Sequence, residues 1–247
     1  MASGLVGLGR MVEPLELLGY ARLALSRGGP LEGRRVVVTA GGTQEPIDPV
    51  RVLANRSSGK QGFALAQAAL DLGAAVTLVS GPVDLQAPVG ARLVGVRTAE
   101  EMLAVVLAET QKADVLIMAA AVADFRPAQP AGNKIKKGGG VPPALKLEET
   151  PDILKRLAEV KAASGYPRVT VGFAAESQNL LANAQTKLQA KRLDLIVAND
   201  ISASDAGFGV DTNRVVLLAP GEEPQSLPLL SKEQVAQAVL ERVLKLL

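Results

Sequence analysis

Asp114-Val115-Leu116-Ile117-Met118, followed by Ala119-Ala120-Ala121, is the clearest structural signal in this sequence of 247 residues. Such an unbroken apolar run is typical of a parallel strand that is buried on both faces of a sheet. Further short strands are predicted at 36–39, 76–79, 169–173, 193–198 and 215–218. Helical spacing predicts helices between them, at 59–72, 98–112 and 178–192. This alternation predicts an α/β fold that is Rossmann-like, with a mostly parallel sheet and helices on both faces.

The two ends of the chain differ from this repeating pattern. A helix over Glu16 to Arg27 is ended by Gly28-Gly29-Pro30, which predicts a separate N-terminal segment at 1–33 and a main domain at 34–247. Strands within 202–230 form a small additional strand region, and Ser231 with Gln234 begins a C-terminal helix. Residues 126–149 are polar and rich in Gly and Pro, so we expect a long loop there.

The composition excludes several classes of chemistry. The chain has no cysteine and no histidine, which removes thiolate metal sites, the usual zinc ligand and the Ser-His-Asp triad. A formal charge of +2 with two Tyr and four Phe gives no case for a nucleic-acid partner. No apolar run is long enough to span a bilayer, so we expect a cytoplasmic protein without membrane contacts.

Ligands of open parallel sheets bind at the carboxyl ends of the strands. That rule points to four loops, at 40–60, 119–137, 172–178 and 198–211. In the first loop Gly41 and Gly42 either let a ligand approach the backbone or make a tight turn. Thr150 is expected to cap the helix that follows the long loop, with Pro151 at its first position.

The segment Asn55-Arg56-Ser57-Ser58-Gly59-Lys60 precedes a predicted helix. Its hydroxyls, free N–H groups and basic side chains face the positive end of that helix, which favours binding of an anion. The alternative is a helix cap with solvated charges. The segment is not a Walker loop, because Gln61 follows the lysine and Ala54 replaces the required glycine.

Three further features are candidates for ligand binding. Asp124 follows the buried strand and could hold a hydroxyl, an amine or a metal, or only cap a turn. Lys134, Lys136 and Lys137 lie beside three glycines and predict a basic flap that closes over phosphates, the alternative being a solvated charge run. Lys187 and Lys191 share one helix face and could neutralise a phosphate chain.

Together these segments resemble phosphopantothenoylcysteine synthetase. The resemblance covers about 34–247 and follows family order. It rests on the stretches 39–51, 55–60, 119–124, 134–137, 151–153, 172–176 and 198–200. Residues 4–14 resemble the end of the flavin-dependent decarboxylase to which this synthetase is often fused. The flavin domain itself is absent, so we expect no flavin and a possible fused decarboxylase in a longer protein.

The resemblance implies an amide-forming ligase. CTP and 4'-phosphopantothenate would give an acyl-cytidylate and pyrophosphate with Mg²⁺, and the amine of cysteine would then release CMP. Asn55 and Lys134 are the expected catalytic residues, and 4'-phosphopantothenate would bind at Asn55, Arg56, Ser57, Ser58, Gly59 and Lys60. The expected nucleotide-binding residues are Gly41, Gly42, Met118, Ala119, Ala120, Asp124, Lys134, Pro151, Asp152, Ile153, Leu154, Phe173, Lys187 and Lys191. Mg²⁺ would be held through the nucleotide phosphates.

The family resemblance also implies a homodimer, and strands within 202–230 without partner helices point the same way. Two other functions remain open. A nicotinamide-dependent reductase would need an acid at the end of the second strand, where Ser80-Gly81-Pro82 stands instead. A non-catalytic nucleotide-binding module is the second alternative. The choice between CTP and ATP also stays open, because backbone contacts select the base.

Overall fold

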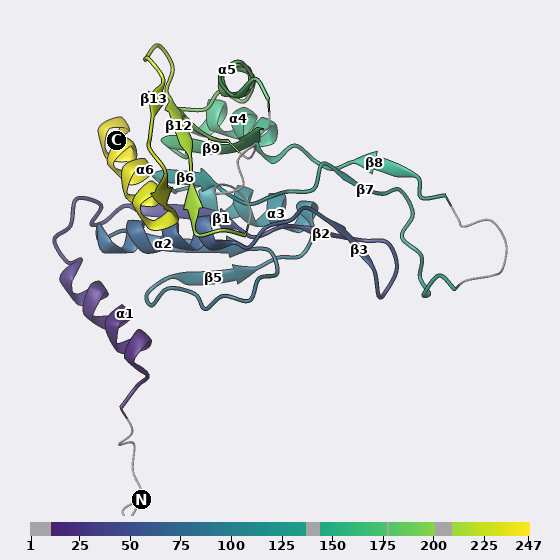
Figure 1. Ribbon diagram of the computed structural model, residues 1–247, viewed down its shortest axis with the longest axis horizontal. Helices are drawn as coiled ribbons and strands as arrows, with labels where there is room; N and C mark the ends of the chain where they lie inside the picture. Colours follow the sequence, from purple (N-terminus) through teal and green to yellow (C-terminus); the bar gives the residue numbers. More distant parts are fainter. Residues whose placement is uncertain (1–10, 137–143, 177, 201–208) are drawn as a thin grey trace, which may run out of the picture.

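A computed structural model describes residues 11–136, 144–176, 178–200 and 209–247. Its centre is an eight-stranded sheet in the order β13-β12-β10-β9-β6-β1-β4-β5 (Figure 1). The strands are β1 (Arg35–Ala40), β4 (Ala75–Ser80), β5 (Arg92–Gly95), β6 (Val115–Met118), β9 (Val169–Glu176), β10 (Leu195–Asp200), β12 (Val215–Leu218) and β13 (Gln225–Ser226).

Six neighbouring strands of this sheet are parallel, and the remaining two are not. β12 pairs antiparallel with β10, and β13 pairs antiparallel with β12. The central strand β6 is buried along its whole length, as its apolar run predicts. The predicted α/β fold with a mostly parallel sheet and an additional strand region is therefore confirmed.

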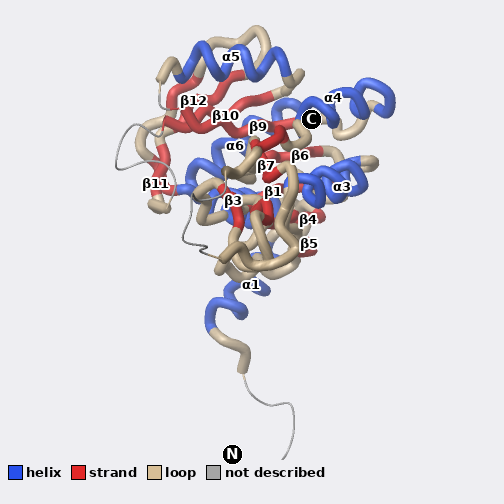
Figure 2. The backbone as a smooth tube through the Cα atoms, turned by 90° about the vertical axis from the view of Figure 1, so that its right-hand side faces the viewer, coloured by secondary structure: helices blue, strands red, loops and turns tan. Residues whose placement is uncertain are grey.

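Helices cover both faces of the sheet (Figure 2). On one face α2 (Lys60–Asp71) and α6 (Lys232–Leu246) pack into a single apolar cluster with alternate strand residues such as Val36 and Val38. Val37 points to the other face, where α3 (Ala99–Thr110), α4 (Ile153–Ser164) and α5 (Leu180–Ala190) lie. Because side chains alternate along a strand, each β-branched run supplies both layers of the core.

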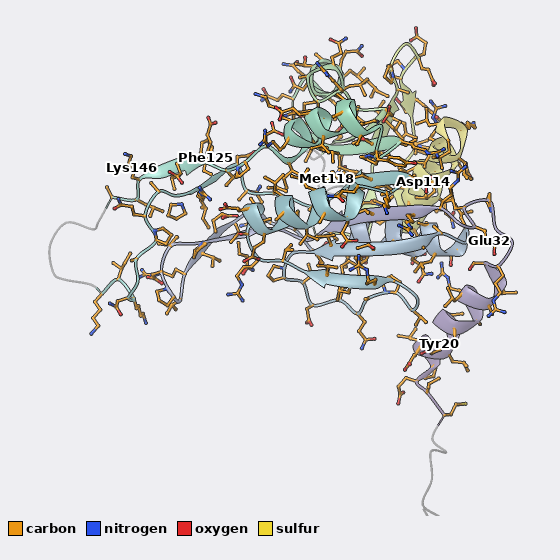
Figure 3. The ribbon with its side chains drawn as sticks, turned by 180° about the vertical axis from the view of Figure 1, so that it is seen from behind. Tyr20, Glu32, Asp114, Met118, Phe125 and Lys146 are labelled. Atoms are coloured by element: carbon orange, nitrogen blue, oxygen red, sulfur yellow. The ribbon has the colours of Figure 1, made fainter. Side chains whose placement is uncertain are left out.

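Two short hairpin-like pairs project from the carboxyl edge of the sheet and form what we call the arm. β2 (Gln44–Pro46) pairs with β3 (Val52–Ala54), and β7 (Phe125–Pro127) pairs with β8 (Leu147–Glu149). Figure 3 shows Phe125 and Lys146 on this arm, away from the body of the sheet. The expected loop at 126–149 is therefore partly wrong, because its two ends pair with each other; residues 137–143 lie outside the described part.

The beginning of α4 differs from the prediction. Asp152 caps this helix, its side chain accepting a hydrogen bond from Lys155 N at 3.0 Å. Thr150 is not the cap, because its hydroxyl donates to the carbonyl of Ala123 instead. Pro151 is not the first helical residue either, because it precedes the cap and the helix begins at Ile153. The structure therefore uses Thr150 to tie α4 to the loop after β6. The predicted start of the C-terminal helix at Ser231 with Gln234 is confirmed as a capping box, and Thr98 with Glu101 forms another one at the start of α3.

Helix α1 (Pro14–Leu25) extends away from the sheet (Figures 1 and 3). It is joined to the body by Arg22, whose guanidinium donates to Asp71 on α2. The division into a segment 1–33 and a domain 34–247 stays a prediction. In the part of the chain that the structure describes, none of the helices combines the length and apolar character needed to cross a membrane.

Candidate functional site

A cavity of about 870 Å³ opens at the carboxyl edge of the sheet. All four loops predicted from strand polarity contribute to its lining: 55–60 before α2, 119–125 after β6, 172–175 in β9, and Asn199 in β10. Pro151 to Leu154 at the start of α4 and Lys187 and Lys191 on α5 complete one side. This volume lies within the usual range of small-molecule pockets, roughly 300–1,000 Å³.

Buried threonines hold the loop that forms the floor of the cavity. Thr39 Oγ1 accepts from Ala120 N at 3.1 Å, and Thr43 Oγ1 accepts from Ala123 N at 2.9 Å. Both threonines are fully buried. A buried N–H without a partner is costly, so these hydroxyls fix the path of the floor backbone.

Gly41 and Gly42 lie beneath this floor and do not line the cavity. Ala121 N donates to Gly41 O at 2.8 Å, which links the two loops. Gly41 has a φ of 74°, and a Cβ at Gly42 would lie 2.9 Å from the carbonyl oxygen of Asn55. These glycines therefore allow the close approach of the backbone segments that carry the site.

Asn55 lines the cavity, and its amide is held in place. Asn55 Nδ2 donates to Val122 O at 2.9 Å, which leaves the second N–H and the amide oxygen for a ligand. The residue does not cap α2, because the N-cap is Gly59 with a φ of 74°. The alternative in which Asn55 acts only as a helix cap is thus wrong.

The segment before α2 carries the expected anion-binding groups. Gly59 N donates to Ser57 Oγ at 3.3 Å, and no side chain caps the helix. Gly62 allows α2 to begin against β1, since a Cβ there would lie 2.5 Å from Ala40 Cβ. Lys60 is half-exposed, and its Nζ lies 2.6 Å from Asp211 Oδ1. The positive end of α2 therefore opens into the cavity.

Lys187 and Lys191 lie on the opposite side, each paired with a carboxylate. Lys187 Nζ is 2.6 Å from Glu176 Oε1, and Lys191 contacts Asp152. Burial raises the pKa of Glu176, but hydrogen bonds from Lys187 and Asn183 outweigh that effect and lower it. Burial lowers the pKa of Lys191. These pairs keep two cations at the cavity before an anion arrives.

Lys134 is the predicted catalytic residue that the structure does not bring to the cavity. It is exposed on the arm, beside Ile135. Ile135 is held by two groups from the β2–β3 turn: its N–H donates to Asp48 Oδ2 at 3.2 Å, and its carbonyl accepts from Arg51 Nη2 at 2.7 Å. Hydrogen bonds from Arg51 and backbone N–H groups outweigh burial and lower the pKa of Asp48 strongly.

Other lining residues were missed by sequence reasoning. These are Gln61, Glu149, Thr150, Asn199, Asn213 and Lys232, together with several small or apolar neighbours. Among the described residues Asn199 Oδ1 is buried without a hydrogen-bond partner, which is a costly arrangement that a ligand donor could relieve. Asn199 lies in the predicted loop 198–211 and in the stretch 198–200 that carries the family resemblance, although it was not named as a site residue. No feature of the sequence linked Lys232 to the site.

Among the residues that the structure describes, the cavity offers few groups for a metal ion. Its carboxylates are Asp124, Glu149 and Asp152, and Asp152 already contacts Lys191. Within the described ranges no group of three or more His, Cys, Asp or Glu residues gathers as a metal site. This fits an ion such as Mg²⁺, which is commonly held by one or two carboxylates and substrate phosphates. Asp124 and Glu149 are both exposed at the cavity and are the carboxylates that could contact such an ion.

Comparisons with known proteins point to one family. The family model described as "DNA/pantothenate metabolism flavoprotein C-terminal domain" matches residues 31–247. The coenzyme A biosynthesis bifunctional protein CoaBC of Bacillus subtilis is 46% identical over 98% of this chain and 59% of the relative. The chain therefore spans about three fifths of the length of that relative.

Solved structures show the same fold. A crystal structure of the C-terminal domain of a CoaBC protein matches with a TM-score of 0.74 and 40% identity, covering 88% of this chain and 97% of the other. A Cab2 variant in complex with phosphopantothenate-cysteine matches with a TM-score of 0.69 and 18% identity, covering 94% and 93% of the two chains. The second likeness concerns the fold alone.

Proposed function

The chain belongs to the family of the DNA/pantothenate metabolism flavoprotein C-terminal domain, and from this premise we propose that it is a phosphopantothenate–cysteine ligase of coenzyme A biosynthesis. It activates the carboxylate of 4'-phosphopantothenate with CTP, and then joins the acyl group to the amine of cysteine. The products are pyrophosphate in the first step, and CMP and the amide in the second.

One observation carries this proposal. Segments that are far apart in the sequence, 55–60, 118–124, 151–154 and Lys187 with Lys191, meet around one cavity. Cationic groups stand at both of its sides, Lys60 on the α2 side and the α5 lysines on the other. The arrangement suits two anionic substrates whose reacting groups must meet near the floor.

The first step needs charge neutralisation more than acid–base catalysis. A carboxylate oxygen attacks the α-phosphorus of CTP, and pyrophosphate leaves with the electron pair of the broken P–O bond. Lys187 and Lys191 can meet the phosphates from α5, and Mg²⁺ adds charge compensation when bound. Lys134, carried on the arm, is proposed to meet the charge that builds on the leaving pyrophosphate.

The second step begins when the cysteine amine attacks the acyl carbon. The carbonyl oxygen gains negative charge, the bond to the CMP oxygen breaks, and the amine loses a proton. Asn55 has one N–H left beside its bond to Val122, and it can donate that hydrogen to the developing oxyanion. Because an amide does not titrate near neutral pH, this donor is present throughout the working range.

The test separates the two half-reactions. Mixing the protein with CTP, Mg²⁺ and 4'-phosphopantothenate should release pyrophosphate, and adding cysteine should release CMP and form the amide. Asn55→Asp should still consume CTP but accumulate the acyl-cytidylate. Normal amide formation by that variant, with no trapped intermediate, would remove Asn55 from the mechanism. Replacing CTP by ATP in the same assay tests the choice of nucleotide.

We further propose that the ligase works as a homodimer, and that in a longer protein it is fused to a flavin-dependent decarboxylase. Exposed apolar side chains on the arm support the dimer. They are Val50, Val52, Phe125, Leu145 and Leu147, with 42–63% of their surfaces exposed. Apolar groups gathered on a projecting element commonly become buried against a second copy.

A further inference from the structure

Asp48 is a buried carboxylate in the turn between β2 and β3, and no step of the proposed reaction uses it. None of its side-chain surface is exposed, although it lies on the projecting arm. Its two oxygens have different partners. Oδ1 accepts from Val50 N at 2.8 Å and from Arg51 N at 2.9 Å, which closes the turn locally.

The second oxygen, Oδ2, holds a segment that lies 87 residues further along the chain. It accepts from Ile135 N at 3.2 Å and from Arg51 Nε at 2.9 Å. Arg51 Nη2 also donates to the carbonyl oxygen of Ile135 at 2.7 Å. Side chains of the turn therefore fix both backbone groups of Ile135. We call this arrangement of Asp48, Arg51 and Ile135 the clasp.

The clasp supports Lys134 from an element that is tied to the body of the protein. Glu45, on β2, is 2% exposed and accepts from Ala99 N at 2.8 Å at the start of α3. Ala131 N donates to Ile47 O at 2.9 Å, so the chain before Lys134 also follows the turn. Lys134 is exposed and directly precedes Ile135. The clasp therefore decides in which direction the Lys134 side chain leaves the backbone.

The Asp48 carboxylate stays ionised through the pH range of an assay. Burial raises the pKa of its carboxyl, but hydrogen bonds from Arg51, Val50 and Ile135 outweigh burial and hold the pKa well below its usual range. An ionised group that is buried and fully hydrogen-bonded holds its partners more firmly than an exposed ion pair does.

We propose that Asp48 is a positioning residue for the first half-reaction and that it acts through Lys134. It contacts no reacting atom. By fixing Ile135 it sets the direction from which Lys134 meets the leaving pyrophosphate. The inference rests on the proposed function, because it names the residue that makes the lysine of the arm effective. A misplacement of about 1 Å caused by a distant residue can cost on the order of 10²-fold in rate.

Asp48→Asn separates the clasp from the turn. Asparagine can keep its oxygen toward Val50 N and Arg51 N, since both Asn and Asp close such turns, so the variant should fold. Its amide nitrogen then replaces Oδ2 and faces the donors of Arg51 and Ile135, which breaks the clasp. The variant should release pyrophosphate roughly 10–100-fold more slowly than the wild type. Coupling of cysteine to preformed acyl-cytidylate should change little.

A double variant shows whether the effect runs through Lys134. If Asp48 only positions Lys134, adding Asp48→Asn to Lys134→Gln should slow pyrophosphate release no further. Asp114→Asn is the matched control. Asp114 is also a buried carboxylate with arginine and backbone N–H partners, but it lies at the amino edge of the sheet. This control should keep wild-type rates in both half-reactions.

Amide hydrogen exchange at Ile135 tests the clasp apart from activity. The Ile135 N–H should exchange at least about 10-fold faster in Asp48→Asn than in the wild type, and Asp114→Asn should leave it unchanged. Unaltered exchange at Ile135, an unaltered first step, equal slowing of both half-reactions, or a further loss in the double variant would overturn the proposal. A wild type that protects Ile135 but releases no pyrophosphate would instead refute the proposed function, and with it any role of the clasp in that step.

Discussion

Replacing Thr43 by valine should destabilise the protein through a single backbone group. Thr43 is fully buried, and its hydroxyl accepts the hydrogen bond of Ala123 N at 2.9 Å. Valine has nearly the same shape but no acceptor, so the buried N–H of Ala123 loses its partner. An unpaired buried donor costs about 1–3 kcal/mol. For a domain of this size that corresponds to a melting temperature about 2–12 °C lower.

The same substitution should also weaken nucleotide binding. Ala123 belongs to the floor of the cavity, next to Asp124, and its backbone would move to find another partner. We therefore expect Thr43→Val to bind CTP more weakly, whereas Thr43→Ser keeps the acceptor and retains binding. Differential scanning calorimetry and titration with CTP measure the two effects separately.

Thr110→Val is the matched control for stability. Thr110 is equally buried, but its hydroxyl donates to the carbonyl of Val106 within α3, so its removal leaves no N–H unpaired. This control should lose clearly less stability than Thr43→Val. If the two variants melt together, or if Thr43→Val stays within about 0.5 kcal/mol of the wild type with unchanged CTP binding, the hydroxyl does not hold the floor.

Three further predictions concern the arm and the body of the domain. Lys134→Gln should slow pyrophosphate release on the order of 10²–10³-fold, the usual effect of losing one donor to developing charge. The coupling of cysteine to preformed acyl-cytidylate should change little. If rapid-quench measurements show an unaltered first step, Lys134 is only a solvated charge. Val52→Glu combined with Leu147→Glu should shift the protein from dimer to monomer in sedimentation at equal concentration, and a wild type already monomeric would refute the arm interface. Asp114 accepts hydrogen bonds from Arg35 N at 3.0 Å and from the Arg34 side chain at 2.8 Å. Burial raises the pKa of the Asp114 carboxyl, but these partners and Arg168 outweigh burial and lower it. Its pKa in the folded protein lies below the unfolded value of about 3.9. Its contribution to the free energy of unfolding is therefore full above that unfolded value and is lost as the pH falls through the folded pKa. Urea titrations should therefore show a smaller difference in the free energy of unfolding between the wild type and Asp114→Asn at acid pH than at pH 7. A difference that does not change with pH would contradict this.

The core strands could be predicted because burial on both faces demands consecutive apolar residues, as in β6 and β10. β5 lacked that signal: it is an edge strand whose residues Arg92 to Gly95 are mostly exposed. The arm escaped prediction for the same reason. Its strands are three residues long, and β8 pairs with β7 across a long stretch of polar sequence. No local apolar pattern marks such a pairing.

Strand polarity predicted which loops meet at the cavity, since the carboxyl ends of parallel strands share one edge of the sheet. It therefore found groups that follow strands, such as Asn55 and Asp124. It could not single out Thr39, which has the pattern of an ordinary strand residue, or Thr43, which lies in the loop that follows. Lys232 reaches the cavity by another route, through the packing of α6 against α2, about 170 residues earlier in the chain. Helix–helix packing brings such residues together without leaving a motif around either one.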